Sequence, residues 1–274
     1  MLAAALLALT LGWIVPAEEA VALPQGSVTI LDARGGCDYR AGHVPGAIRI
    51  NWMTYRRGWF RSGKLPKDLD ALARKMAKLG VDQDRPVIVI GGGREAWGED
   101  GRIVWMLAHL GHEDVRQLDG GWDAWVAAGG PVSKKKERAL AATFAARPVA
   151  SLRASKSDVA SAKAQGVVLL DVRTTKEWNG ARPYWESRGG HVPDAVHLHW
   201  KDLLDEKSRL DPAAKEKLEA LGVKTGTPVI TYCTGGVRSA EALVVLKALG
   251  FTDVRNYDGS WYEWSADKKL PVAK

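Results

Sequence analysis

The residues best suited to chemistry form the run Cys233-Thr234-Gly235-Gly236-Val237-Arg238-Ser239, which directly follows the apolar segment Val229–Tyr232. That segment is predicted to be a buried strand, and the residues after the run are predicted to be a helix. In an open parallel sheet, the crevice beyond the carboxyl end of a strand is the usual ligand site. A loop from such a strand into a helix turns backbone N–H groups inward, at the positive end of the helix dipole. Gly235 and Gly236 allow a tight curl, and Arg238 adds a positive charge.

A cysteine at the mouth of such a loop is predicted to ionise readily. Helix N-termini and nearby arginines lower the pKa of a thiol from about 8.5, by one unit to several. Cys233 is therefore predicted to be an activated sulfur nucleophile beside a pocket for an anion, a site that requires neither a metal nor an organic cofactor. The structural alternative is an inert cysteine buried at the end of a strand.

The chain contains two copies of one sequence pattern. The motifs LDAR (31–34) and GHVPGA (42–47) match LDVR (170–173) and GHVPDA (190–195), with offsets of 139 and 148, so the second copy holds nine extra residues between them. Further matches follow in the same order: LGV at 79–81 and 221–223, PVI at 86–88 and 228–230, and LDGGW at 118–122 with YDGSW at 257–261. Ordered matches of this kind predict a tandem duplication of one domain.

Each copy alternates short β-branched runs with helical patterns. Strands are predicted at Val28–Leu31, Val87–Ile90 and Val115–Leu118, and again at Val167–Val172, Val229–Tyr232 and Val254–Tyr257. Helices are predicted over Leu69–Leu79, Ile103–Leu110, Ala213–Leu221 and Ala240–Leu249. The alternation predicts an α/β fold of two tandem domains, each a small parallel sheet flanked by helices.

The expected organisation is a first domain at 27–130, a linker at 131–150 and a second domain at 151–274. The linker is assigned from its basic run (134–138) and an Ala-rich stretch without apolar periodicity. Residues 1–20 are set outside the fold, as a signal peptide or N-terminal anchor. Their apolar run, Leu2–Val15, is shorter than the roughly 20 residues that span a bilayer, and small residues follow it as at a signal-peptidase site. We expect export, to the periplasm in a Gram-negative source, with a cytoplasmic or N-terminally anchored protein as the alternative.

The two copies differ at the cysteine. Residues 86–90 align with 228–232, so Gly91 occupies the position of Cys233. The first domain is therefore predicted to be non-catalytic and to form the other wall of a cleft. The run from Gly91 to Ala96 mimics a dinucleotide-binding fingerprint, but a degenerate active loop explains it better, so no cofactor is expected.

Composition and the remaining motifs narrow the functional classes. The 274 residues are 46% hydrophobic and 26% charged, which excludes a disordered, collagenous or multi-span membrane chain. The net charge of +7 suits anionic substrates or serves solubility alone, and we expect no nucleic-acid partner. His197 and His199 have no third ligand near them in the sequence, so no metal site is expected. Cys37, the other cysteine, is predicted to be an exposed bystander, with a resolving thiol for Cys233 as the alternative.

The paired LDAR…GHVPGA and LDVR…GHVPDA motifs, the Cys-x4-Arg loop and the closing YDGSW resemble the two-domain rhodaneses, which are thiosulfate and 3-mercaptopyruvate sulfurtransferases. The resemblance covers about residues 27–270. It implies a catalytic second domain, an inactive first domain and a ping-pong reaction in the cleft between them. The partners it implies are a small anionic sulfur donor and a thiol, cyanide or protein acceptor. We expect a monomer without a stable membrane span.

The resemblance also implies roles for individual residues. Cys233 is implied to be the nucleophile and persulfide carrier. The residues implied to bind the transferred sulfur and the anionic end of the donor are Thr234, Gly235, Gly236, Val237 and Arg238. Asp171 and Arg173 are implied to support the site, and Asp258, Ser260 and Trp261 to brace the loop. Glu177 stands where some members carry a substrate-binding arginine, and Arg188 is the candidate to supply that charge.

Three alternatives stay open beside thiosulfate, the preferred donor. The first is 3-mercaptopyruvate as the donor, and the second is a module that carries a persulfide to another protein without turnover on small acceptors. The third is a cysteine phosphatase-like enzyme. Phosphatases of this kind place five residues between Cys and Arg, whereas residues 234–237 are four, a spacing better matched to a single sulfur atom.

Overall fold

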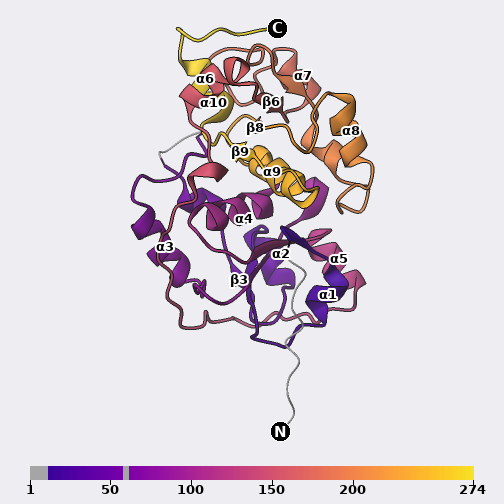
Figure 1. Ribbon diagram of the computed structural model, residues 1–274. Helices are drawn as coiled ribbons and strands as arrows, with labels where there is room; N and C mark the ends of the chain where they lie inside the picture. Colours follow the sequence, from indigo (N-terminus) through magenta and orange to yellow (C-terminus); the bar gives the residue numbers. More distant parts are fainter. Residues whose placement is uncertain (1–11, 58–61) are drawn as a thin grey trace.

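The computed structural model describes residues 12–57 and 62–274, which form two α/β units stacked along the long axis of the molecule (Figure 1). The first unit contains β1 (Ile14–Val15), α1 (Ala17–Val21), β2 (Thr29–Asp32), α2 (Gly36–Ala41), β3 (Ile48–Arg49), α3 (Leu69–Ala77), β4 (Val87–Ile90), α4 (Glu99–His109), β5 (Val115–Leu118) and α5 (Gly121–Ala127). The second contains α6 (Lys156–Ser161), β6 (Val168–Asp171), α7 (Thr175–Trp178), β7 (Val196–His197), α8 (Ala214–Ala220), β8 (Val229–Tyr232), α9 (Arg238–Ala248), β9 (Val254–Asn256) and α10 (Ser260–Ala266). Short 3-10 turns occupy Trp52–Tyr55, Gly93–Glu95, Ala150–Leu152, Lys163–Gln165 and Trp200–Leu203.

Both sheets are parallel, with the strand orders β1-β5-β4-β2-β3 and β7-β6-β8-β9. The tandem α/β architecture predicted from the repeat is confirmed. The registers of the two units are equivalent, since Asp32 pairs with Ile90 in the first and Asp171 pairs with Tyr232 in the second. Gly91 therefore stands in the first unit where Cys233 stands in the second. The carboxyl ends of β4 and β8 are the two edges at which a ligand site of this fold would form.

Residues 14–21 are part of the first unit, which corrects the expectation that residues 1–20 lie outside the fold. Ile14 pairs with Gln117 and Val15 with Leu118 along β5. Val15 and the helix residue Ala17 are buried among the apolar side chains of this unit. Short apolar runs fit an edge strand as well as a signal sequence, and sequence pattern does not separate the two. The part of the predicted leader before residue 12 lies outside the described residues. Among the described helices, none combines the length and apolar character needed to cross a membrane.

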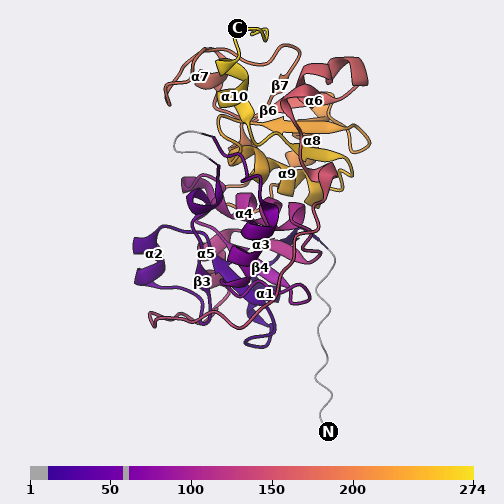
Figure 2. The same ribbon diagram turned by 90° about the vertical axis from the view of Figure 1, so that its left-hand side faces the viewer.

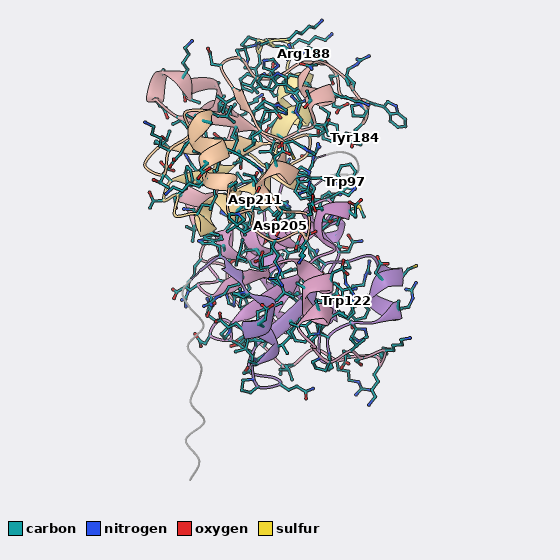
Figure 3. All side chains as sticks on the ribbon, turned by 90° about the vertical axis from the view of Figure 1, so that its right-hand side faces the viewer. Trp97, Trp122, Tyr184, Arg188, Asp205 and Asp211 are labelled. Atoms are coloured by element: carbon teal, nitrogen blue, oxygen red, sulfur yellow. The ribbon has the colours of Figure 1, made fainter. Side chains whose placement is uncertain are left out.

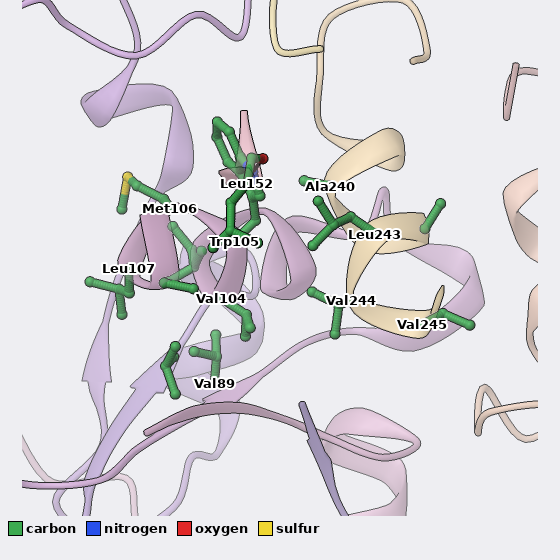
Figure 4. Close-up of a cluster of buried hydrophobic side chains, with 14 of the residues drawn as sticks. Val89, Val104, Trp105, Met106, Leu107, Leu152, Ala240, Leu243, Val244 and Val245 are labelled. Carbon is green, nitrogen blue, oxygen red and sulfur yellow. Dashed lines mark hydrogen bonds between the residues drawn. The ribbon is translucent and has the colours of Figure 1, made fainter. Parts of the chain in front are cut away.

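The two units meet through α4 and α9, which pack against each other and share one apolar core. Figure 4 shows Val104 and Trp105 of α4 facing Leu243 and Val244 of α9. Both helices begin with polar residues and start earlier than the apolar pattern predicted, α4 at Glu99 and α9 at Arg238. The first turn of each helix thus lies beside the loop that follows the central strand of its unit.

The segment 131–150 connects the units and runs along the first one (Figure 2). Most of it is exposed, as predicted, but it is fastened by backbone hydrogen bonds. The Gln83 N–H donates to Thr143, and the N–H groups of Arg147 and Val149 donate to Leu110 and His109. Phe144 is buried in the core. The connection is therefore packed against the first unit, which fixes where the second unit begins.

Candidate active site

Cys233 is the first residue after β8, at the carboxyl end of the second sheet. Its side chain is 1% exposed. The Sγ atom accepts a hydrogen bond from the Gly236 N–H at 3.1 Å and another from the Ser239 hydroxyl at 3.6 Å. Gly236 has a φ of +83°, in the left-handed region that glycine adopts without strain. The Cys233 loop (residues 233–238) therefore curls back so that an amide and a hydroxyl point at the sulfur.

The surroundings of Cys233 favour its thiolate form. Burial raises the pKa of this thiol, because a low-dielectric environment disfavours charge. The positive charge of Arg238, the Ser239 hydroxyl and loop N–H groups act in the opposite direction and outweigh burial, so the pKa lies below its ordinary value. These groups stabilise negative charge on sulfur, which is the charge present on the reacting form of a cysteine nucleophile.

Arg238, the first residue of α9, is paired with Glu177 of α7. Two hydrogen bonds of 2.8 Å join the guanidinium to the two carboxylate oxygens. The Thr234 hydroxyl donates to Glu177 at 2.5 Å and accepts from Arg238 at 2.7 Å. Burial raises the pKa of Glu177, but its bonds to Arg238 and Thr234 bring that pKa down to about 2. The charge of Arg238 is therefore shared between a buried carboxylate and the thiol, and the side chains of Thr234 and Arg238 shape the loop.

The segment that leads into α10 holds the Cys233 loop from behind. The Ser260 hydroxyl accepts the Cys233 N–H at 3.1 Å, and the Trp261 N–H donates to the Cys233 carbonyl at 3.0 Å. Asp258 packs so closely that a Cβ added to Gly236 would lie 2.6 Å from the Asp258 carbonyl oxygen. Ser260 itself has a φ of +49°, an unusual conformation for a residue with a side chain. These contacts fix the backbone on both sides of the sulfur.

Asn256 belongs to the site but was not predicted from the sequence, and Ser239 was named in the run after Cys233 without a role. The Asn256 amide accepts from the Ser239 hydroxyl at 2.7 Å and donates to the Gly236 carbonyl at 3.3 Å. Asn256 thus orients the hydroxyl that faces Cys233. The available signal was a polar residue at the end of the apolar strand run at 254–257, because buried polar side chains need partners.

Asp171 and Arg173 form a buried ion pair with a structural geometry. Arg173 donates to both oxygens of Asp171 and to the Gly190 carbonyl at 2.8 Å. The first unit repeats the arrangement: Arg34 donates to Asp32 and, at 2.7 Å, to the Gly42 carbonyl. The pair therefore joins the end of a strand to the turn of the GHVP motif, and it does so in the unit without a cysteine as well.

Arg188 is not placed at the Cys233 loop, which corrects its expected role in substrate binding. Its guanidinium donates to four backbone carbonyls of the C-terminal segment, those of Trp264, Ser265, Asp267 and Leu270. Figure 3 shows Arg188 far from Trp97 and the junction of the two units. Carbonyls at the end of α10 need donors, and the arginine at the end of the nine-residue insertion supplies them.

The first unit contributes a wall to the site. A segment of that unit, Ser62–Leu65, here called the strap, lies against the Cys233 loop, and a Cβ added to Gly63 would be 1.8 Å from the Gly235 carbonyl oxygen. Trp97, which is 46% exposed, lies over the Arg238 guanidinium at 5.6 Å and contacts the Tyr184 ring edge to face at 5.4 Å. Figure 3 shows Trp97 and Tyr184 together where the two units meet. The candidate site is thus bounded by residues of both units.

The equivalent position in the first unit cannot perform the same chemistry. The Trp122 N–H donates to the Gly91 carbonyl at 3.0 Å, as Trp261 does to Cys233. The space beside Gly91 is filled by a carboxylate, because an added Cβ would be 2.0 Å from the Asp100 Oδ2. Gln117 donates to this carboxylate at 3.0 Å and to Glu241 of α9 at 2.9 Å. This loop has become part of the contact between the units.

Other sequence candidates lie outside the site. Within residues 12–57 and 62–274, no cluster of three or more His, Cys, Asp or Glu side chains is arranged to hold a metal ion. The His197 ring bonds to the Arg173 carbonyl at 2.8 Å. Cys37 is exposed on α2 and accepts a hydrogen bond from Arg40 at 3.3 Å.

Comparison with known proteins places this arrangement in a family. The rhodanese-like domain matches the chain twice, at residues 16–128 and 155–267, and the chain belongs to the rhodanese-like family. It is 33% identical over 250 residues to the thiosulfate sulfurtransferase of Corynebacterium glutamicum, covering 85% of this chain and 80% of that protein. It is 29% identical over 252 residues to the sulfur carrier protein TtuD of Thermus thermophilus, covering 86% of this chain and 87% of that one. The crystal structure of SseA from Escherichia coli, described as a 3-mercaptopyruvate sulfotransferase, matches with a TM-score of 0.78 and 27% identity, covering 91% of this chain and 99% of that one.

Proposed function

We propose that this protein is a sulfurtransferase that moves a sulfane sulfur from thiosulfate to a thiophilic acceptor through a persulfide on Cys233. The observation that carries the proposal is the Cys233 loop itself: a thiol with a lowered pKa whose sulfur accepts hydrogen bonds from the Gly236 amide and the Ser239 hydroxyl. The relationship to the thiosulfate sulfurtransferase of Corynebacterium glutamicum supports the choice of reaction.

In the first half-reaction, the Cys233 thiolate attacks the outer sulfur of thiosulfate. A new S–S bond forms at Cys233, the S–S bond of the donor breaks, and its electron pair leaves on sulfite. The hydrogen bonds from Gly236 and Ser239 keep the sulfur charged and directed before attack. Preorganised donors of this kind act like an oxyanion hole built for sulfur, because they need no rearrangement during the reaction.

In the second half-reaction, a nucleophile attacks the terminal sulfur of the persulfide. The persulfide S–S bond breaks and returns its electron pair to Cys233 as a thiolate, while cyanide becomes thiocyanate or a thiol becomes a persulfide. The loop donors then stabilise the leaving thiolate as they stabilised the attacking one. The same groups therefore assist both steps, and no electron acceptor is required.

The geometry of Arg238 argues against the phosphatase alternative. A phosphate-binding loop needs its arginine to face the bound oxyanion, whereas Arg238 gives two hydrogen bonds to Glu177 and one to Thr234. The donor 3-mercaptopyruvate is the second candidate, favoured by the overall similarity to the Escherichia coli structure. The ratio of kcat/KM for the two donors decides between them.

Intact-mass measurement after incubation with thiosulfate tests the proposal. The wild-type chain is expected to gain the mass of one sulfur atom and to lose it on addition of cyanide. Cys233→Ser should gain nothing, and Cys37→Ser, which alters the exposed cysteine, should behave as the wild type. Steady-state sulfite release with cyanide present separates an enzyme from a carrier that is loaded but turns over slowly. A sulfur adduct that persists in Cys233→Ser would overturn the assignment.

We also propose export, from the apolar run at residues 2–15, and the structure limits where processing would be tolerated. Cleavage after Ala17 would remove β1, whose Val15 pairs with Leu118 and is buried. N-terminal sequencing of the protein recovered from cell fractions tests this. A mature chain that starts before Gly12 agrees with export of an intact first unit, and an unprocessed cytosolic pool contradicts export.

A further inference from the structure

Arg102 is a buried arginine of the first unit that lies at the contact with the second. It is on α4 and is 1% exposed. One of its terminal nitrogens, Nη2, donates to the Gly63 carbonyl of the strap, and its guanidinium lies over the Trp105 ring at 4.5 Å. Its other terminal nitrogen, Nη1, is buried and has no hydrogen-bond partner among the described residues. Burying a cation without a carboxylate partner costs free energy, so the presence of Arg102 at this position indicates that it has a function.

The partner of Arg102 connects it to the Cys233 loop. Gly63 lies so near the Gly235 carbonyl that no side chain fits between them. The strap is also fixed at its far end, because the Leu65 N–H donates to the Asp258 carboxylate at 2.9 Å. Gly235 and Gly236 are thus held between the strap on one side and Asp258 on the other. A displacement of the strap would free the amide that faces the sulfur.

The charge of Arg102 acts on Cys233 as well. Burial lowers the pKa of Arg102 to about 10, and the negative charges of Asp258 and the Cys233 thiolate oppose that change. Arg102 is therefore still a cation at neutral pH. Asp258 has another partner, Arg153 at 2.8 Å, and the charge of Arg238 is offset by Glu177. Arg102 consequently supplies a positive charge that no carboxylate within 4.0 Å neutralises among the described residues.

We propose that Arg102, a residue of the non-catalytic unit, is a positioning residue for Cys233 of the other unit. Its hydrogen bond holds the strap against the Cys233 loop, and its charge favours the thiolate. This inference rests on the proposed sulfur transfer at Cys233. It assigns the first unit a function in that reaction beyond forming a wall.

The test compares Arg102→Met, which removes both the charge and the hydrogen bond to Gly63, with Arg102→Lys, which keeps the charge but not the guanidinium group. All variants carry Cys37→Ser, so that the ultraviolet absorbance of the thiolate reports Cys233 alone. The matched control is Arg94→Met, because Arg94 also crosses between the units, donating to the carbonyls of Leu204 and Asp205. It removes an arginine from the same contact without touching the strap.

In Arg102→Met, we expect the thiol pKa to rise, since a buried positive charge favours the thiolate and its removal favours the neutral thiol. The kcat/KM for thiosulfate at neutral pH should then fall by about tenfold or more. Arg102→Lys should restore the thiol pKa while kcat/KM stays below that of the wild type, and Arg94→Met should leave the pKa unchanged. If Arg102→Met does not fold, the Lys variant decides alone: wild-type kcat/KM in it overturns the proposal.

A wild-type thiol pKa in a folded Arg102→Met variant would also overturn the inference, whatever its activity. Failure of the proposed function is a separate result. In that case the wild-type chain itself forms no persulfide from thiosulfate, and the comparison of variants is not reached.

Discussion

The Arg238 guanidinium donates a hydrogen bond of 2.8 Å to each oxygen of the Glu177 carboxylate, and both side chains are buried. The two residues are far apart in sequence and belong to the helices that flank the Cys233 loop. Because of this pairing, Arg238 is held where it shapes the Cys233 loop and favours the thiolate of Cys233. It also ties Glu177 to the Cys233 loop, since the Thr234 hydroxyl of that loop donates to the same carboxylate.

Glu177→Gln is predicted to destabilise the protein, because it leaves the buried Arg238 cation without its partner. Breaking a buried pair in this way costs about 3 kcal/mol or more, measured as the free energy of unfolding in urea. The pKa of Glu177 is about 2, below its unfolded value, so its contribution is present above the unfolded pKa and is lost as pH falls through the folded one. The difference between variant and wild type should therefore shrink as pH falls from about 5 toward 2. A difference independent of pH over that range would contradict the role of the charge.

Glu241→Gln is predicted to stabilise the protein in mildly alkaline solution. Burial and the charge of Glu99 raise the pKa of Asp100 to about 6. Burial and the charges of Asp100 and Glu99 raise the pKa of Glu241 well above its usual range. A carboxyl group whose pKa is raised in the folded state does not reduce the stability of the protein at a pH below its unfolded-state pKa. The protein loses stability as the pH rises through the folded-state pKa of that group. The melting temperature of the wild type should thus decline from pH 5 to pH 9 more steeply than that of Glu241→Gln.

The control for that experiment is Glu219→Gln, which alters an exposed glutamate on α8. Its melting curve should follow the wild type at every pH. Parallel declines for the wild type and Glu241→Gln would show that the carboxyl pair between the units does not titrate.

Gly236→Ala is predicted to abolish most activity. The added Cβ would lie 2.6 Å from the Asp258 carbonyl oxygen, and the φ of +83° is strained for alanine. The loop must shift, which removes the Gly236 N–H from the Cys233 sulfur. Loss of one such donor reduces kcat by about a hundredfold or more in comparable sites.

Gly250→Ala is the matched control, with a φ of +90° and open space around the added carbon. It should cost stability, about 1 kcal/mol, and leave kcat unchanged. Equal activities of the two variants would contradict the model of a fixed loop.

Asp171→Asn and Asp32→Asn are predicted to have equal effects, because their ion pairs with Arg173 and Arg34 have equivalent geometry and both are buried. Each should lower the free energy of unfolding by about 3 kcal/mol, as expected for a broken buried pair. Below the melting transition, both folded variants should retain similar kcat values. If Asp171→Asn alone lost activity while it stayed folded, the pair would have a direct catalytic part that the repeated geometry does not indicate.

The fold could be predicted largely from the sequence because its signals are local and occur twice. The strands predicted at Val28–Leu31 and Val167–Val172 lie within one residue of β2 and β6 at each end, because their apolar runs are local signals. The loop around Cys233 likewise follows from the placement of its glycines. The pairing of Glu177 with Arg238 could not be predicted, since it depends on where two helices meet in space. For the same reason, the family resemblance suggested a substrate contact for Arg188, although its guanidinium donates to backbone carbonyls of the C-terminal segment.

The first domain was predicted to form a wall of the cleft, but the residues of that wall could not be named from the sequence. The residues near Gly63 and Arg102 do not resemble a catalytic motif. Gly63 contributes only its backbone carbonyl, and Arg102 is a single arginine within a helix. The edge strand at Val15 was hidden for a different reason: its apolar run also suits an export signal. In each case the missing information is a tertiary contact.

The carboxylate beside Gly91 makes the loss of chemistry in the first unit hard to reverse. A cysteine placed at Gly91 would collide with Asp100, whose oxygen lies 2.0 Å from the required Cβ position. Clearing that space would break the amide-bridged contact through Gln117 to Glu241 and loosen the half that holds Cys233. Asp100 and Gln117 thus both fill the site in the first unit and join that unit to the second. A substitution that reopened the first site would therefore require compensating substitutions in the second unit.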